Sequence, residues 1–371
     1  MPDSVRPRVA FFLPSLSGGG AEKVSVNLLK GLVDQNEIEL DLDLALVKAG
    51  GVFIADVPKE VTIKELNCKR VATAVLSLIR YLREARPVVL LSHMNHANII
   101  AILAVKVARS DTKVVVVEHI SLTDRNVHGL WNKTYNLIMK VAYRGADSIV
   151  GVSQGVSTSV ENRMGLEKGT VETIYNPVIT PDTRRMAAEP VDHPWLESRE
   201  LPVFLAIGRL TEQKNFSVLI EAFHLLLKRK DARLIILGEG ELRSELEQLA
   251  EKLGVSDNID MPGFNSNPYS HLRRANAFVL SSKFEGLPTA LIESIACGCP
   301  VVSTDCPSGP YEILDGGKYG KLVPVDDVAA LTDAMADILE NPIAPDILEE
   351  RSQIFSMEVI SREYLHLLLR N

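Results

Sequence analysis

Two hydrophobic periods alternate along the chain. Short apolar runs of strand length precede segments in which apolar residues recur every three or four positions. In the first half we expect strands at residues 9–13, 40–47, 88–92, 113–118 and 148–152, and helices at residues 21–33, 71–85, 98–109, 132–144 and 156–164. Strands that alternate with helices predict a parallel sheet covered by helices.

The same order begins again after residue 200. Strands are expected at residues 202–207, 233–237, 259–261, 277–280 and 300–303, and helices at residues 216–228, 241–253 and 359–368. Residues 179–200 are rich in proline and charge without a clear period, so they are interpreted as an interdomain linker. We therefore predict an α/β fold with two doubly wound, Rossmann-like domains at residues 1–178 and 201–357. Ligands of such sheets bind outside the carboxyl ends of the strands.

The composition is that of a folded soluble protein with room for two domains. Of 371 residues, 46% are hydrophobic and 24% charged. No apolar run reaches the roughly 20 residues that span a bilayer, and residues 9–13 are too short for a signal-peptide core. The four cysteines lack the spacing of a zinc site. We therefore expect a cytoplasmic protein.

Charge is distributed unevenly between the two halves. Residues 1–185 hold 23 Lys and Arg against 19 Asp and Glu, whereas residues 186–371 hold 17 against 29. The basic excess of the first half indicates an anionic partner, such as a membrane surface or a phosphorylated lipid. A nucleic acid is not expected, because no basic run alternates with aromatic residues and the pI is about 5.6.

Two acids flank a short segment after the apolar run at residues 277–282. Seven residues separate Glu285 from Glu293, and Pro288 suits the first position of a helix. The N–H groups near Leu287 and Thr289 would then be unpaired donors at a helix N-terminus, where phosphate binds well. This segment offers polar groups for a sugar, donors for phosphates and an acceptor for a ribose.

A basic pair follows the first strand of the second domain. Arg209 comes directly after Gly208, and Lys214 lies five residues further on. Arginine offers a planar fork of donors and lysine a point charge, so the pair can neutralise a diphosphate. The alternative interpretation is that both are ordinary charged residues of a solvated loop.

Two further loops of the second domain are weaker candidates. Gly238 and Gly240 follow a strand, but Arg243 stands where the third glycine of a dinucleotide-binding motif would be, so a nicotinamide cofactor is not expected. Gly263 and Phe264 follow another strand, where a tight turn is an adequate alternative to a nucleotide site.

The first domain carries candidates at three strand ends. Gly18, Gly19 and Gly20 follow the first strand and can bring main-chain N–H groups against a ligand. His119 ends the strand at residues 113–118, and His93 and His96 end the strand at 88–92 and are expected to line an acceptor site.

The segment from Glu285 to Glu293, with Gly286, Leu287, Pro288 and Thr289 inside it, resembles the signature of the retaining glycosyltransferases of family 4. The loop with Arg209 and Lys214 is similar to that family's diphosphate-binding loop. The resemblance covers nearly the whole chain and implies the GT-B fold, in which two Rossmann-like domains face each other across a cleft. It further implies that the C-terminal helix, about residues 358–371, crosses back to the first, acceptor-binding domain.

The resemblance also implies roles for the candidate residues. The catalytic set would be His119, Arg209, Lys214 and Glu285, with His119 and Glu285 contacting the sugar. Glu293 would bind the ribose and Gly263 with Phe264 the base. Donor binding would involve Gly18, Gly19, Gly208, Arg209, Lys214, Gly238, Gly263, Phe264, Glu285, Gly286, Leu287, Pro288, Thr289 and Glu293, and acceptor binding would involve Gly20, His93 and His96.

A metal-independent mechanism without a cofactor is expected. Arg209, Lys214 and helix N–H groups can stabilise the charge of the leaving diphosphate, as a metal would in another fold. Asp41 and Asp43 match an Asp-x-Asp metal motif, but the strict alternation around them places both on a polar strand face. The resemblance implies retention, with attack on the face that the diphosphate leaves.

The resemblance favours a UDP-linked hexose or N-acetylhexosamine as donor and a glycan, carried on a polyprenyl diphosphate, as acceptor. Basic and aromatic residues between Arg125 and Arg144 predict a helix that lies on an anionic membrane, peripherally on the inner face of the cytoplasmic membrane. The buried face of an ordinary domain helix is the alternative. Two other functions stay open, a GT-B sugar-nucleotide epimerase and a nucleotide-sugar-binding adaptor.

Overall fold

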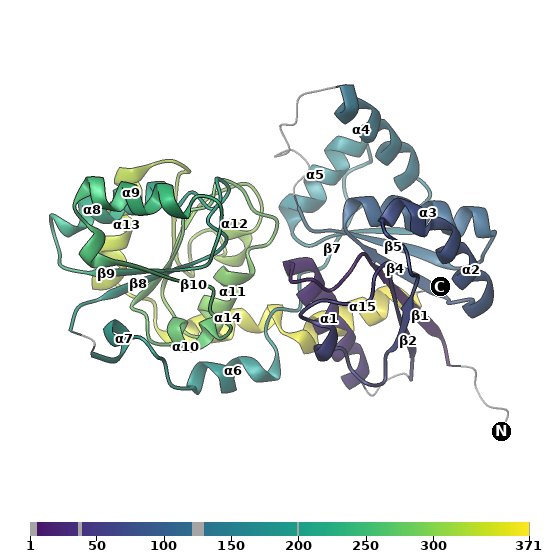
Figure 1. The fold of residues 1–371 in the computed structure, drawn as a ribbon, viewed down its shortest axis with the longest axis horizontal. Helices are drawn as coiled ribbons and strands as arrows, with labels where there is room; N and C mark the ends of the chain where they lie inside the picture. Colours follow the sequence, from purple (N-terminus) through teal and green to yellow (C-terminus); the bar gives the residue numbers. More distant parts are fainter. Residues whose placement is uncertain (1–5, 36–38, 121–129, 199, 371) are drawn as a thin grey trace. The chain divides into compact units, whose positions relative to one another are not determined.

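The structure is a computed structural model that describes residues 6–35, 39–120, 130–198 and 200–370, with the side chains of residues 130–136 outside the description. The chain divides into two compact units. One comprises Met1–Pro177 with Met357–Asn371, and the other comprises Val178–Ser356. Each unit is built on its own parallel sheet (Figure 1). Two parallel-sheet α/β units confirm the predicted fold class.

The first unit holds a seven-stranded sheet in the order β3-β2-β1-β4-β5-β6-β7. Its strands are β1 (Arg8–Leu13), β2 (Asp41–Leu46), β3 (Thr62–Glu65), β4 (Val89–His93), β5 (Lys113–Glu118), β6 (Ser148–Gly151) and β7 (Glu172–Thr173). Its helices are α1 (Gly20–Asp34), α2 (Val75–Ala85), α3 (Asn95–Ala108), α4 (Leu130–Tyr143), α5 (Gln154–Met164) and α15 (Met357–Leu369). Helices α2 to α5 pack against their neighbours in sequence, whereas α1 packs with α15 (Figure 1).

The second unit holds a six-stranded sheet in the order β10-β9-β8-β11-β12-β13. Its strands are β8 (Val203–Ile207), β9 (Arg233–Leu237), β10 (Ile259–Gly263), β11 (Ala277–Leu280), β12 (Val301–Thr304) and β13 (Lys321–Val323). Its helices are α6 (Pro181–Ala188), α7 (Pro194–Ser198), α8 (Phe216–Leu227), α9 (Arg243–Leu253), α10 (Pro268–Leu272), α11 (Thr289–Ala296), α12 (Pro310–Ile313), α13 (Val328–Glu340) and α14 (Pro345–Ser352). One face carries α8, α9 and α13, and the other carries α10, α11 and α14 (Figure 1).

Fully buried strands explain why the apolar runs were easy to find. In β1 and β5 every residue after the first is buried, and β11 is buried throughout. A parallel sheet covered on both faces gives such continuous runs. No helix in the described ranges is long and apolar enough to cross a membrane.

The polar face predicted for β2 is only half right. Asp41 is partly exposed, but Asp43 is buried, at 3% exposure. The Tyr81 hydroxyl donates to Asp43 at 2.7 Å, and the Arg8 guanidinium approaches the same carboxylate at 3.9 Å. Tyr81 belongs to α2, so this helix covers the polar face of β2 at Asp43.

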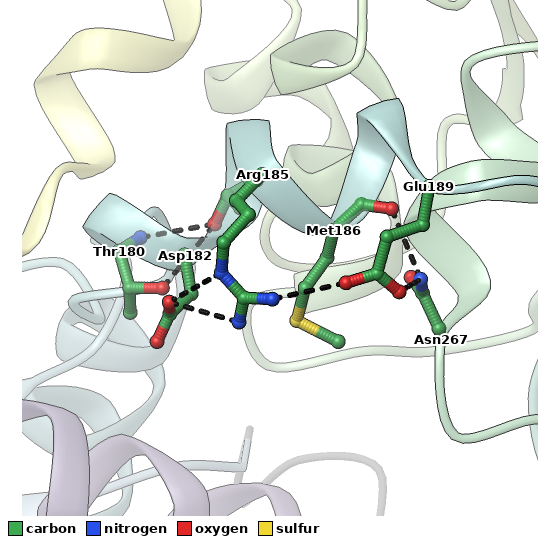
Figure 2. A network of polar contacts seen from close by, with 7 residues as sticks. Thr180, Asp182, Arg185, Met186, Glu189 and Asn267 are labelled. Carbon is green, nitrogen blue, oxygen red and sulfur yellow. Dashed lines mark hydrogen bonds and ion pairs between the residues drawn. The ribbon is translucent and has the colours of Figure 1, made fainter.

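The expected linker at residues 179–200 is part of the second unit. It contains α6 and α7, and Asn267 at the start of α10 anchors α6 (Figure 2). The Asn267 side-chain amide donates to the main-chain oxygen of Met186 at 3.0 Å and to the Glu189 carboxylate at 2.7 Å. Arg185 spans the helix to Asp182 and Glu189. Long-range contacts of this kind leave no periodic signal in the segment itself.

The C-terminal helix belongs to the first unit. Its predicted apolar face is buried at Ile360, Tyr364, Leu367 and Leu368. Helix α15 packs on α1, where Gly31 allows close approach, because a Cβ at Gly31 would lie 1.9 Å from the Ser361 hydroxyl oxygen.

We predict that Gly31→Ala lowers the free energy of unfolding by about 1–3 kcal/mol, because the added methyl group overpacks the contact between α1 and α15. Equilibrium urea unfolding measures the change. Gly20→Ala is the matched control in the same helix, because a Cβ there would meet no atom within 4 Å. Equal stability of both variants would show that α15 is not held closely against α1.

Candidate functional site

Strand order gives the second unit a position where ligands bind in open α/β sheets. From β8 the chain moves outward to β9 and β10, then returns to β11 on the other side of β8. Neighbouring strands whose connections diverge in this way form a topological switch point. The loop after β8 carries Gly208, Arg209 and Lys214, and the loop after β11 carries Glu285.

Lys214 and Glu285 meet at this switch point. The Lys214 ammonium lies 2.7 Å from Oε1 of Glu285, and both side chains are largely buried, at 18% and 9% exposure. The hydroxyl of Ser282 donates to the same oxygen at 2.6 Å. Charge-assisted hydrogen bonds of this length fix the carboxylate in one orientation. The structure thus brings together Lys214 and Glu285, which were predicted as site residues from two separate segments of the sequence.

Ser282 and Gln213 were missed by the sequence analysis. Gln213 donates to the main-chain oxygen of Phe284 at 3.0 Å and approaches Oε2 of Glu285 at 3.5 Å. Gln213 adjoins Lys214, and Ser282 lies three residues before Glu285. Their nearness to named residues was the available signal, since neither residue type is diagnostic by itself.

Arg209 differs from Lys214 in its surroundings. Its side chain is exposed, and it forms no ion pair with any residue that the structure describes. Gly208 gives the Lys214 side chain its path, because a Cβ at Gly208 would lie 3.0 Å from Cε of Lys214. The loop therefore presents one cation held by Glu285 and one that is open to solvent.

The N-terminus of α11 offers main-chain donors beside Glu285. Pro288 is the N-cap and Thr289 the first helical residue, so the helix starts one residue later than predicted. In the described part of the chain, the N–H groups of Leu287, Thr289 and Ala290 have no hydrogen-bond acceptor. Gly286 and Leu287 are buried, while Thr289 is partly exposed. Such a terminus favours an anion.

Glu293 lies on α11 and is also buried, at 6% exposure. The Tyr269 hydroxyl, from α10, donates to its Oε1 at 3.1 Å. Tyr269 was missed by the sequence analysis because nothing in its local sequence relates it to a residue 24 positions away. Glu285 and Glu293 therefore both have protein donors that orient them.

The glycines after β9 have a packing reason of their own. Gly238 has a φ of +146°, and a Cβ there would lie 1.9 Å from the main-chain oxygen of Gly208. A Cβ at Gly240 would lie 2.3 Å from the main-chain oxygen of Leu210. Arg243, in place of a third glycine, bonds Glu239 at 2.8 Å. Donor contact by Gly238 stays a prediction, because loop packing alone already requires glycine here.

The end of β10 exposes an aromatic ring. Phe264 is 81% exposed, although a phenylalanine usually lies in the core. Gly263 before it has a φ of +95°, and a Cβ there would lie 2.7 Å from the Glu239 carboxylate. The turn therefore needs glycine and displays Phe264 to solvent, which suits stacking on a base.

The glycine loop of the first unit follows β1, which also lies at a switch point, between β2 and β4. Contrary to expectation, the N–H groups of Gly18 and Gly19 are not open to a ligand. They donate to the Glu22 carboxylate at 2.7 and 3.0 Å. The helix dipole favours an acid in the first turn of α1. The sequence analysis did not consider that Glu22 would compete with a ligand for these N–H groups. Gly20 is exposed and begins α1.

His119 and His93 lie on adjacent strand ends and contact each other. Nδ1 of His93 is 2.8 Å from Nε2 of His119. Burial lowers the pKa of His119 to about 4, and burial also lowers the pKa of His93 well below its ordinary value. His93 is fully buried, so its predicted contact with an acceptor is wrong for this structure. His96 is exposed, but it lies in the first turn of α3 instead of at a strand end.

A buried carboxylate supports the strand end beneath His119. Glu118 is fully buried and accepts hydrogen bonds from the Asn98 side-chain amide at 2.9 Å and from the Tyr143 hydroxyl. Asn98 also donates to the main-chain oxygen of Val117 at 3.1 Å. These contacts fix the end of β5 relative to α3 and α4.

Among the described residues, no group of three or more His, Cys, Asp or Glu side chains is arranged to hold a metal ion. This finding does not cover a metal site whose ligands include other groups, such as main-chain oxygens or a bound substrate. Metal independence therefore stays a prediction.

Known proteins resemble both halves of the chain. The family described as Glycosyltransferase Family 4 matches residues 18–181, and the family described as Glycosyl transferases group 1 matches residues 191–354. An uncharacterized glycosyltransferase of Methanocaldococcus jannaschii is 32% identical over 244 residues, which are 64% of this chain and 60% of that protein.

Two other similarities extend over nearly the full length. A Campylobacter jejuni enzyme named N-acetylgalactosamine-N,N'-diacetylbacillosaminyl-diphospho-undecaprenol 4-alpha-N-acetylgalactosaminyltransferase is 27% identical, over 98% of this chain and 99% of the enzyme. Anabaena HepE, solved in complex with UDP and glucose, superposes with a TM-score of 0.79 at 18% identity, covering 98% of this chain and 99% of HepE. With two matched families and two parallel-sheet units, the chain belongs to the family-4 glycosyltransferases of GT-B fold.

Proposed function

We propose that this protein is a retaining glycosyltransferase. It moves a hexose or N-acetylhexosamine from a UDP-linked donor to a glycan on a polyprenyl diphosphate, in the synthesis of a surface glycan. The name of the Campylobacter jejuni relative contains a diphospho-undecaprenol acceptor, and HepE was solved with UDP. Both names support the proposal.

The observation that carries the proposal is the grouping of charges at the β8/β11 switch point. Lys214 and Glu285 form an ion pair there, with Arg209 on the same loop as Lys214 and Glu293 on the helix that follows Glu285. A nucleotide-sugar needs cations for its diphosphate and carboxylates for its hydroxyl groups. Arg209, Lys214 and the N–H groups of α11 serve the diphosphate, Glu285 the sugar and Glu293 the ribose.

The reaction breaks the bond between the anomeric carbon and the diphosphate oxygen. The diphosphate leaves with the electron pair, and cations already in place stabilise its new charge. The acceptor hydroxyl bonds to the anomeric carbon on the same face, and its proton passes to the leaving diphosphate oxygen. No protein nucleophile is required, and no metal is needed to balance the charge.

Glu285 suits hydroxyl binding better than nucleophilic attack. Its Oε1 already accepts hydrogen bonds from Lys214 and Ser282, and Gln213 faces its other oxygen. A carboxylate whose charge is shared with a cation and a hydroxyl donor is a weaker nucleophile than a free one. His119 contacts the transferred sugar in this proposal, and Phe264 stacks on the base.

A donor panel tests the reaction. Purified protein is given UDP-, GDP- and ADP-linked sugars with a polyprenyl-linked glycan extract, and free nucleotide is measured with and without EDTA. We expect release from one UDP-sugar, unchanged by EDTA, because protein cations and helix N–H groups stabilise the leaving group. Binding of a donor without release would contradict the proposal and favour the adaptor. A changed sugar without release would indicate an epimerase.

The ribose contact has a test of its own. We expect Glu293→Gln to raise the KM for the UDP-sugar about 10- to 100-fold, since a hydrogen bond to a charged group contributes about 1.5–3 kcal/mol. Initial-rate kinetics give the value. Glu251→Gln is the matched control, because Glu251 is an exposed acid on α9. An unchanged KM in Glu293→Gln would remove this residue from the donor site.

We further propose that α4 contacts an anionic membrane surface. In its described part, Leu137, Ile138 and Val141 are 62%, 48% and 63% exposed, beside the basic residues Lys140 and Arg144. An apolar stripe flanked by cations is typical of helices that lie on membranes. The basic and aromatic residues on which the membrane prediction depends run from Arg125 to Arg144, but residues 121–129 and the side chains of residues 130–136 lie outside the described residues.

Vesicle co-sedimentation tests this contact. We expect the protein to sediment with phosphatidylglycerol vesicles more than with phosphatidylcholine vesicles, and Leu137→Ser with Val141→Ser to reduce binding about tenfold or more. Ile347→Ser, at an exposed apolar residue of α14, is the control. Equal binding of the α4 variant and the control would rule out this helix as the contact.

A further inference from the structure

His93 and His119 form a pair that the reaction described above leaves partly unused. They stand at the carboxyl ends of the adjacent parallel strands β4 and β5. Their ring centroids are 5.1 Å apart, and Nδ1 of His93 lies 2.8 Å from Nε2 of His119. His119 is partly exposed, whereas His93 is fully buried. A ligand can therefore reach His119 but not His93.

Both rings are neutral at neutral pH. Burial lowers the pKa of each, and the nearby His119 lowers the pKa of His93 further. Two nitrogens at hydrogen-bond distance share a single proton, because protonating both would set one N–H group against the other. The pair therefore has two arrangements, in which either His93 or His119 is the donor.

The surroundings of His93 decide between them. Its other nitrogen, Nε2, is buried without a hydrogen-bond partner in the described part of the chain, and its ring stacks on Phe11 with centroids 6.2 Å apart. If His119 donated, His93 would carry its proton on Nε2 as a buried N–H without an acceptor. If His93 donates, only a bare nitrogen is buried there. Orphaned buried N–H groups are rarer in proteins than under-satisfied acceptors.

The backbone beside His93 is constrained as well. Met94 has a φ of +77°, which is rare for a residue other than glycine, and the chain turns there from β4 into α3. Such a conformation persists only where the surrounding structure determines it. Asn98 secures the turn, because its N–H donates to the main-chain oxygen of Met94 at 2.9 Å. The His93 ring is thus held in place from both its ring face and its backbone.

We propose that His93 is a positioning residue whose Nδ1–H donates to Nε2 of His119 and thereby keeps the proton of His119 on Nδ1. His119 then offers a hydrogen-bond donor, and not an acceptor, to its ligand. The matching ligand group is an oxygen with a free lone pair, such as a hydroxyl or carbonyl oxygen of the sugar. This last step rests on the proposed function, whereas the placement of the proton does not.

The tautomers can be read directly from the ligand-free protein. The full chain is labelled with ¹⁵N-histidine, and long-range ¹H–¹⁵N correlation spectra are recorded at neutral pH. The chain has eight histidines, and His93→Phe and His119→Gln assign the two that matter. We expect both rings to be neutral with the proton on Nδ1, whereas free imidazole side chains favour Nε2. A wild-type His119 with its proton on Nε2 would overturn the proposal.

Variants of His93 test whether this residue determines which nitrogen of His119 carries the proton. His93→Phe keeps an aromatic ring against Phe11 but removes the donor, so the His119 proton should return to Nε2. His93→Asn can place an amide donor near the position of Nδ1 and should keep it on Nδ1. Ser92→Ala is the control, because Ser92 is buried on the same strand and its hydroxyl has no partner among the described residues. A His119 proton that stays on Nδ1 in His93→Phe would overturn the causal role.

Activity separates this inference from the function. In an active enzyme, His93→Phe should lower kcat/KM on the order of tenfold, the effect of about one hydrogen bond, and His93→Asn should restore most of it. If the donor panel finds no transfer while His119 carries its proton on Nδ1, the proposed function fails and the role of His93 stands. If His93→Phe does not fold, the wild-type spectrum and the Asn variant still decide.

Discussion

The strand order of the second sheet is the constraint on which the candidate donor site depends. Because β8 and β11 are neighbours while the chain leaves them in opposite directions, residues 71 positions apart meet as Lys214 and Glu285. A buried ion pair is weak evidence for stability, since desolvation opposes the attraction between the charges. Its value here is orientation, which Ser282 and Gln213 reinforce. Gly208 follows from the same geometry, because the Lys214 side chain passes over it.

The first unit uses its own switch point differently. The N–H groups of Gly18 and Gly19 are bonded to Glu22, and Nε2 of His119 is bonded to Nδ1 of His93. Polar groups at a partly buried edge need such partners, because an unsatisfied group costs about 1–3 kcal/mol. In the part of the chain that the structure describes, the two edges therefore differ. The second unit has an exposed Arg209 and helix N–H groups without an acceptor, whereas the glycine N–H groups and the His119 ring of the first unit are bonded within the protein.

Much of the fold and site could be predicted because the signals are local. Buried parallel strands give continuous apolar runs, and the motif residues Arg209, Lys214, Glu285 and Glu293 stand in short segments with recognisable spacing. The missed elements have no such signal. Tyr269 lies on a helix of only five residues. The composition of α6 is typical of a linker, and its position in the second unit depends on hydrogen bonds from the distant Asn267. Contacts between distant segments supply what those sequences lack.

The sequence by itself determined the two-sheet architecture, the family and the identity of the charged candidate residues. Hydrophobic periodicity and motif spacing can be recognised within a few positions along the chain. Only the tertiary structure decided which of these residues are open to a ligand. His93 is buried and so cannot contact a ligand directly, and Asp43 is buried instead of facing solvent. The N–H groups of Gly18 and Gly19 donate to Glu22 instead of to a ligand. Accessibility and hydrogen-bond partnership depend on neighbours from other strands and helices, and those neighbours exist only once the chain has folded.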